Sequence, residues 1–413
     1  MNFNIIFKMK ILFIATHPFT KTGYSKIAYI LSNTLSNYKP NTEISYLALD
    51  LYDEELLNER KMNTNIKIIP RYESIHTGKV YNDINNIVMY EKPDVIFLYN
   101  DLIVCCNIFN KLLEINKNLY KFKVITYLDL VYPYQKYLFI NHINNNSNKI
   151  LVFSDYWKNN LIDMKINENK IEVLEHPIYN KLFKVLNSRE LLNLDEEDFI
   201  ILNLNRNTYR KCWDITIKSF LIFLKNNNFN KNIKLYIKCD LKNNSGYNIL
   251  EMIKTYTIMM NISNYYEKII NFHILTINNK TDISDKIINL IYNSCDIGIN
   301  TCCGEGFGLC NMEHAYLGKP QIVSNVGGLS DIFSNNNSIK IDSCYQLTCC
   351  DNIDEHTGEL YYTDPNEFAK GLQFYYENQD KRKEYGEKIS THIKNKYTID
   401  NFNKKIYKIL DEI

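Results

Sequence analysis

Short apolar runs alternate with segments of helical periodicity along most of the 413-residue chain, and the whole pattern occurs twice. In the first half, five apolar runs predict buried strands, at 11–15, 44–49, 95–99, 124–128 and 150–153. Strands separated by helices are typical of βαβ units, which pair their strands in a parallel sheet. The first half therefore predicts an α/β domain.

A second set of strands follows a polar segment, 175–198, that is interrupted by Pro177 and is the candidate linker. Its members are 199–204, 234–238, 269–273, 297–300 and 321–324. A chain of this length can form two separate cores. We expect two Rossmann-like, doubly wound domains, 1–180 and 190–385, that face each other across a cleft. The segment 386–413 is expected to be helical and to pack back on the first domain. One large α/β domain is the alternative.

Composition excludes several classes of function. The formal net charge is +1, so no overall field favours nucleic acid or an anionic membrane. Eleven cysteines are scattered without a C-x-x-C pattern, which favours reduced thiols in the cytoplasm over a disulfide framework. A metal site at Cys302, Cys303 and Cys310 is a minor alternative. Lys8 and Lys10 interrupt the apolar N-terminus, which argues against a signal peptide, and peripheral membrane contact is left open.

The richest motif is the glycine-rich segment 304–309, Gly-Glu-Gly-Phe-Gly-Leu, which follows the predicted strand 297–300 and opens a helix. Glycines let backbone amides approach an anion, and a helix N-terminus adds positive potential. Glu305 and Glu313, eight positions apart, offer acceptor oxygens to hydroxyl groups. This combination suits a sugar joined to a diphosphate. The alternative is that Glu305 caps the helix and Glu313 only favours its dipole.

Arg206 and Lys211 follow the predicted strand 199–204, immediately before another helix. Two cations at a strand's carboxyl end can hold a diphosphate and stabilise it as a leaving group. The alternative is a solvated basic loop, since Arg210 lies between them. Near the N-terminus, Gly23 precedes a predicted helix and is a weaker candidate for a phosphate contact.

Together these motifs resemble the large family of retaining glycosyltransferases with the GT-B fold, known as group 1 or family 4. The family's central motif, in which Glu, Gly-Phe-Gly and a second Glu follow one another, is matched by residues 305–313. Its Arg and Lys, with four residues between them, are matched by Arg206 and Lys211. Its Gly-x-Pro strand entry and Gly-Gly turn are matched by 318–320 and 327–328.

The resemblance implies transfer of a hexose from a UDP- or GDP-sugar to a hydroxyl group of a glycan, lipid or protein, with retention of anomeric configuration. Arg206, Lys211 and Glu305 are expected to be catalytic. Donor contacts are expected from Gly23, Gly306, Phe307, Gly308, Leu309 and Glu313, of which Glu313 would bind the ribose. On the acceptor side we expect His17, Tyr24 and Asp129. The chain has no Asp-x-Asp pair, so no metal cofactor is expected, and the two cations would supply its charge.

The chain departs from the family pattern at a few positions. Leu128 stands where the family often has a histidine near the acceptor, and Asn205 replaces the glycine before the arginine. Two other classes stay open. A glycoside hydrolase also uses two carboxylates, but it needs no cationic clamp for a diphosphate. A non-catalytic nucleotide-sugar-binding or scaffold protein would share the fold.

Overall fold

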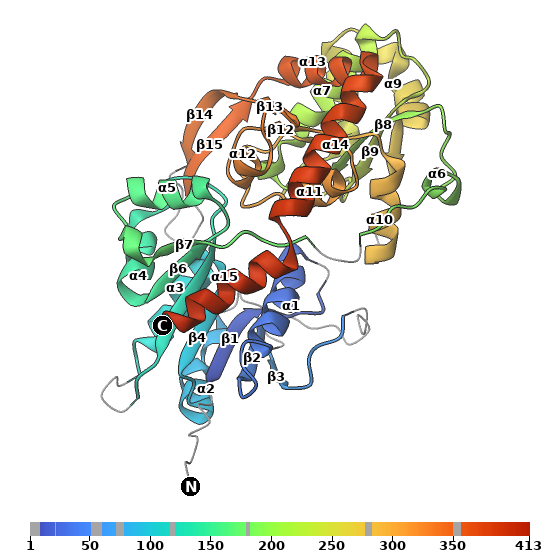
Figure 1. Cartoon of the computed structure of the whole chain (residues 1–413). Helices are drawn as coiled ribbons and strands as arrows, with labels where there is room; N and C mark the ends of the chain where they lie inside the picture. The colour runs from blue at the N-terminus through green and yellow to red at the C-terminus, as the bar shows by residue number, and fades with distance from the viewer. Residues whose placement is uncertain are drawn as a thin grey trace. The chain divides into compact units, whose positions relative to one another are not determined.

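The computed structural model of the chain describes residues 9–20, 22–50, 60–71, 78–115, 120–178, 182–276, 283–349 and 357–413. These residues form two compact units (Figure 1). Unit 1 consists of the described residues within 1–177, 350–358 and 399–413, and unit 2 of those within 178–349 and 359–398. The prediction of two Rossmann-like α/β domains is confirmed, because each unit has its own parallel sheet.

The sheet of unit 1 has seven strands in the order β3-β2-β1-β4-β5-β6-β7, and all the pairings are parallel. The strands are β1 (Lys10–Thr16), β2 (Glu43–Leu49), β3 (Ile66–Pro70), β4 (Val95–Asp101), β5 (Lys123–Asp129), β6 (Lys149–Val152) and β7 (Ile171–Val173). The helices are α1 (Gly23–Ser36), α2 (Ile84–Glu91), α3 (Leu102–Leu112), α4 (Tyr137–Asn146), α5 (Asp155–Asp163) and α15 (Ile399–Asp411), with short turns η3 (Lys79–Tyr81) and η4 (Glu168–Lys170). Side chains of β1 and β4 are almost completely buried, as expected for central strands of a parallel sheet.

The sheet of unit 2 repeats this arrangement with six strands, in the order β10-β9-β8-β11-β12-β13. The strands are β8 (Phe199–Leu204), β9 (Ile233–Lys238), β10 (Ile274–Thr276), β11 (Ile297–Asn300), β12 (Gln321–Ser324) and β13 (Ile339–Ile341). The longer helices are α7 (Trp213–Asn226), α8 (Ile249–Met259), α10 (Asp285–Ser294), α11 (Leu309–Tyr316), α13 (Pro365–Glu377) and α14 (Gln379–Lys396). The shorter ones are α6 (Ser188–Leu191), η5 (Tyr209–Lys211), η6 (Ser263–Tyr265), α9 (Tyr266–Lys268), η7 (Ile269–His273) and α12 (Gly328–Ile332).

One predicted strand is wrong. Residues 269–273 form the π-helical turn η7, and β10 begins only at Ile274. A five-residue apolar run does not distinguish a strand from a helical turn by its periodicity. The His273 ring is buried and bonds through Nδ1 to the Ile233 carbonyl at 2.8 Å, which ties this turn to the start of β9.

The C-terminal segment is helical, and a break at 397–398 separates α14 from α15. α14 packs against α11 in unit 2, where Ser390 Oγ donates to the Tyr316 carbonyl at 2.6 Å. α15 lies in unit 1 against α1, where Thr34 Oγ1 bonds to Asn403 Oδ1 at 2.8 Å.

A separate two-stranded sheet pairs β14 (Ser343–Cys349) with β15 (Gly358–Thr363). No helix among the described residues combines the length and the apolar character that a bilayer crossing needs.

Candidate functional site

Unit 2 places two polar loops side by side at the carboxyl ends of its central strands. The strand order reverses between β8 and β11, whose neighbours lead to opposite edges of the sheet. Such a switch point leaves a crevice outside the strand ends, where α/β proteins bind ligands. The loop after β8 carries Arg206, Arg210 and Lys211, and the loop after β11 carries Glu305 and the glycine-rich segment.

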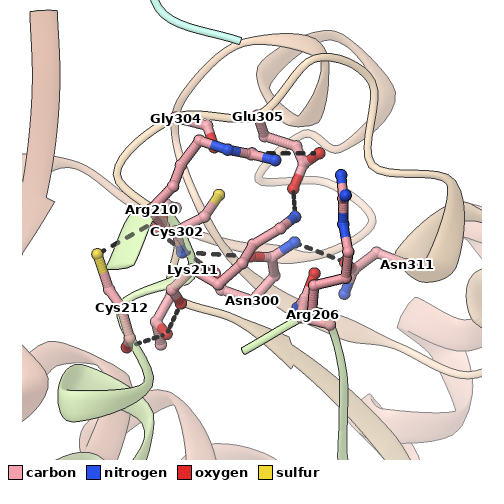
Figure 2. Close-up of polar contacts among 12 residues, drawn as sticks. Arg206, Arg210, Lys211, Cys212, Asn300, Cys302, Gly304, Glu305 and Asn311 are labelled. Atoms are coloured by element: carbon pink, nitrogen blue, oxygen red, sulfur yellow. Dashed lines mark hydrogen bonds and ion pairs between the residues drawn. The ribbon is translucent and has the colours of Figure 1, made fainter. Parts of the chain in front are cut away.

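Lys211 and Glu305 form a direct ion pair between these two loops (Figure 2). Lys211 Nζ bonds to Glu305 Oε2, and the residues are only 7% and 8% exposed. Arg210 adds a second cation, with Nη1 3.8 Å from Oε1 of the same carboxylate. Burial alone would raise the Glu305 pKa, but the charges of Lys211 and Arg210 outweigh it, so the pKa lies below its ordinary value. Glu305 is therefore ionised at neutral pH.

Arg206 differs from the other two cations because its side chain is exposed. Figure 2 shows its guanidinium pointing to the side of the loops on which Glu305 lies. Its backbone carbonyl accepts a hydrogen bond from Trp213 Nε1 at 3.1 Å, which fixes the loop to the start of α7. No salt bridge joins it to any residue in the described part of the chain. Three cations and one carboxylate give these two loops a net charge of +2.

The glycine-rich segment turns sharply into α11, as its sequence predicts. Gly308 has a φ of +93° and is the N-cap residue of the helix. A Cβ atom at Gly308 would lie 2.4 Å from Leu329 Cδ2, and one at Gly328 would lie 2.5 Å from Phe307 Cα. No side chain caps the helix, so Glu305 is not its capping residue. The segment 306–309 thus packs against the Gly-Gly turn with its first helical amides uncapped by a side chain.

Glu313 is the fifth residue of α11 and is only 2% exposed. The Tyr292 hydroxyl donates a hydrogen bond to Glu313 Oε2 at 3.0 Å. The Tyr292 ring in turn stacks on His314, with the ring centroids 5.6 Å apart. These contacts hold the Glu313 carboxylate in one orientation within the first two turns of the helix.

Several residues that sequence reasoning did not select support the site. Asn300 is the last residue of β11, and its side chain donates a hydrogen bond to Glu305. Its Nδ2 also donates a hydrogen bond to Asn311 Oδ1 at 2.8 Å. Asn311 donates to Gln321 Oε1 at 2.9 Å. Arg210 appeared in the sequence only as part of a basic loop. An asparagine that closes an apolar strand just before the motif was the available signal for Asn300.

Unit 1 gathers His17, Tyr24 and Asp129 near the carboxyl ends of its own strands. His17 follows β1, and its burial lowers its pKa to about 4. Tyr24 lies in the first turn of α1 and donates its hydroxyl to Asp129 at the end of β5. Burial and the charge of Asp129 raise the Tyr24 pKa well above its ordinary value. Gly23 is the exposed first residue of α1, whose N-cap is Thr22.

Among the described residues, no three His, Cys, Asp or Glu side chains are grouped so that they could hold a metal ion.

Comparisons with known proteins bear on the family and on the fold of the chain. Residues 264–392 match the family model of group 1 glycosyl transferases, which confirms the resemblance predicted from the motifs. Among curated proteins, none matches the sequence significantly.

Solved structures share the fold over almost the whole chain. Sucrose-phosphate synthase from Thermosynechococcus elongatus is 12% identical, with a TM-score of 0.73 over 98% of this chain and 99% of that one. HepE from Anabaena, in complex with UDP and glucose, is 13% identical, with a TM-score of 0.68 over 98% and 100%. The lipopolysaccharide outer core galactosyltransferase WaaB is 14% identical, with a TM-score of 0.61 over 98% and 100%. The GT-B fold class is thereby confirmed.

Proposed function

We propose that this group 1 glycosyltransferase of the GT-B fold transfers a hexose from a UDP- or GDP-sugar to a hydroxyl acceptor, with retention of configuration and without a metal ion. The observation that carries the proposal is the cluster at the switch point of unit 2. There Arg206, Arg210, Lys211 and Glu305 meet the glycine-rich start of α11.

The charge of this cluster matches that of the donor. The loops carry a net charge of +2 without ligand, and the diphosphate of a nucleotide sugar carries about −2 at neutral pH. Lys211 and Arg206 would bind the phosphates and stabilise the extra negative charge that develops as the nucleoside diphosphate leaves. Because fixed cations supply this charge, no metal ion is needed for it.

The two carboxylates would bind the hydroxyl groups of the donor. We assign Glu305 to the transferred sugar and Glu313 to the ribose, with backbone groups of 306–309 contacting sugar and phosphate. We assign Gly23 to the donor as well, and His17, Tyr24 and Asp129 to the acceptor. UDP is the first nucleotide to test, because HepE was solved with UDP and with UDP-glucose.

The test is donor hydrolysis by the purified chain. UDP-glucose, UDP-N-acetylglucosamine and GDP-mannose would each be incubated with the protein, and release of UDP or GDP would be followed by a coupled assay. Slow release of nucleotide from one donor, abolished in the Lys211→Ala variant, would support an enzyme. Tight binding of a nucleotide sugar without any release would support the alternative, a non-catalytic binding or scaffold protein.

A further inference from the structure

Arg210 contacts three consecutive residues of the loop that carries Glu305. Its backbone carbonyl accepts a hydrogen bond from the Cys303 N–H at 3.0 Å. Its guanidinium donates to the Gly304 carbonyl at 2.6 Å, and Nη1 lies 3.8 Å from Glu305 Oε1 (Figure 2). Main chain and side chain of one residue thus fasten the loop after β8 to the loop after β11.

Lys211 and Arg210 interact with different oxygens of Glu305. Lys211 Nζ bonds to Oε2, whereas the Arg210 guanidinium is nearest to Oε1. Either cation can therefore move away from the carboxylate without displacing the other. The backbone N–H of Lys211 donates a hydrogen bond within its own loop. The Arg210 side chain, in contrast, is also bonded to the Gly304 carbonyl of the other loop.

In the proposed reaction, Lys211 would bind two anions in turn. Its ammonium is paired with Glu305 in the structure, and it is also expected to bind the diphosphate of the donor. Glu305 is 8% exposed, so water would solvate it poorly once Lys211 had moved. An ionised carboxylate left without a partner in such a place is costly. A second cation that stays behind lowers this cost.

We propose that Arg210 is this resident counter-ion: a positioning residue that keeps Glu305 ionised and oriented while Lys211 moves its ion pair from Glu305 to the diphosphate. The inference rests on the proposed function, because the diphosphate is the incoming anion. It assigns to Arg210 a role separate from direct contact with the donor.

The proposal predicts a change in proton binding when Arg210 loses its charge. Without that charge, departure of Lys211 would leave Glu305 in a poorly solvated site with no cation, so the carboxyl group would take up a proton when the diphosphate binds. The titratable neighbours of Glu305 are Lys211 and Arg210 from the loop after β8 and the Cys302 thiol from its own loop. Burial raises the pKa of the Cys302 thiol, which stays neutral. Glu305 is therefore the group that would accept the proton.

Isothermal titration calorimetry tests this directly. Wild type, Arg210→Gln and Arg210→Lys would be titrated with UDP, and in parallel with GDP, at pH 7.5 in two buffers that differ in ionisation enthalpy. We expect Arg210→Gln to bind about 10-fold or more weakly and to take up more protons than wild type. Arg210→Lys, which keeps the charge, should bind within about threefold of wild type without extra uptake.

Arg189→Gln is the matched control. Arg189 also joins a carboxylate and backbone carbonyls, through Asp296 at 2.8 Å and the Ser294 carbonyl at 3.0 Å, at the opposite end of β11. Its replacement should lower stability and leave nucleotide affinity and proton uptake unchanged.

Wild-type affinity for Arg210→Gln, with no additional proton uptake, would overturn the counter-ion role and leave the proposed function standing. Absence of binding of both UDP and GDP to wild type would overturn the proposed function and this inference with it. Should Arg210→Gln not fold, more proton uptake by Arg210→Lys than by wild type on binding UDP would overturn the role, because a retained positive charge should keep Glu305 ionised.

Discussion

Replacing Lys211 with alanine removes the cation that contacts Glu305 most closely. Removing one partner of a buried ion pair costs about 3–5 kcal/mol. Arg210 stays 3.8 Å from the other carboxylate oxygen, so we expect the lower end of this range, about 3 kcal/mol. Each kcal/mol lowers the melting temperature of a domain of 150–250 residues by about 2–4 °C. The variant should therefore melt about 6–12 °C below wild type at pH 7.5.

The difference in melting temperature between wild type and Lys211→Ala should depend on pH in a defined direction. In wild type the Glu305 pKa is below its ordinary value, because the charges of Lys211 and Arg210 outweigh burial. Such a group stabilises the folded state above the unfolded pKa, and the contribution is lost as the pH falls through the folded pKa. In the variant, burial is opposed by Arg210 and hydrogen bonding alone, so the pKa rises and protonation relieves the destabilisation. The gap in melting temperature should narrow between pH 7.5 and pH 4.5.

Activity provides a second measurement on the same variant. Loss of a cation that stabilises the leaving group should lower donor turnover by about two to three orders of magnitude. Lys234→Ala is a suitable control, because Lys234 lies 3.8 Å from the buried Asp198 carboxylate near the opposite end of the sheet of unit 2. It should lose stability and keep its turnover. Turnover of Lys211→Ala within about threefold of wild type, or a melting gap that is the same at both pH values, would refute the reasoning.

Three further variants and one chelator treatment test the remaining assignments. Glu313→Gln keeps the side-chain volume and removes the charge, so UDP affinity should fall by about 10-fold by calorimetry; unchanged affinity would exclude a ribose contact. Gly308→Ala should lower the free energy of unfolding by about 1–3 kcal/mol more than Gly318→Ala. Both glycines have positive φ, but only at Gly308 would a Cβ atom collide with a neighbour, Leu329. Equal losses in urea denaturation would contradict this. Asp129→Asn should retain donor hydrolysis and lose transfer to an acceptor, and equal losses in both assays would argue against an acceptor-side role. EDTA should leave turnover within about twofold, and a loss restored by Mg²⁺ would show a metal requirement.

The sequence determined the two-domain α/β class, because the alternation of strands and helices is a local property that repeats along the chain. It also determined the start of α11: the positive φ of Gly308 and the close approach of Gly328 to Phe307 demand glycine at these positions. The five-residue run 269–273 shows the limit of such patterns, since a short apolar run has no periodicity that distinguishes a strand from the π-helical turn formed there.

Only the tertiary structure decided which charges meet. Lys211 and Glu305 lie 94 positions apart, and they pair because β8 and β11 are neighbours in the sheet with parallel carboxyl ends. From the sequence, Arg210 was indistinguishable from a solvated lysine or arginine in a loop. Its role depends on the distances to the Gly304 carbonyl and to Glu305 Oε1. Spacing along the chain names the residue types that a diphosphate site needs, whereas ion pairs between strand ends depend on sheet order, which no local pattern encodes.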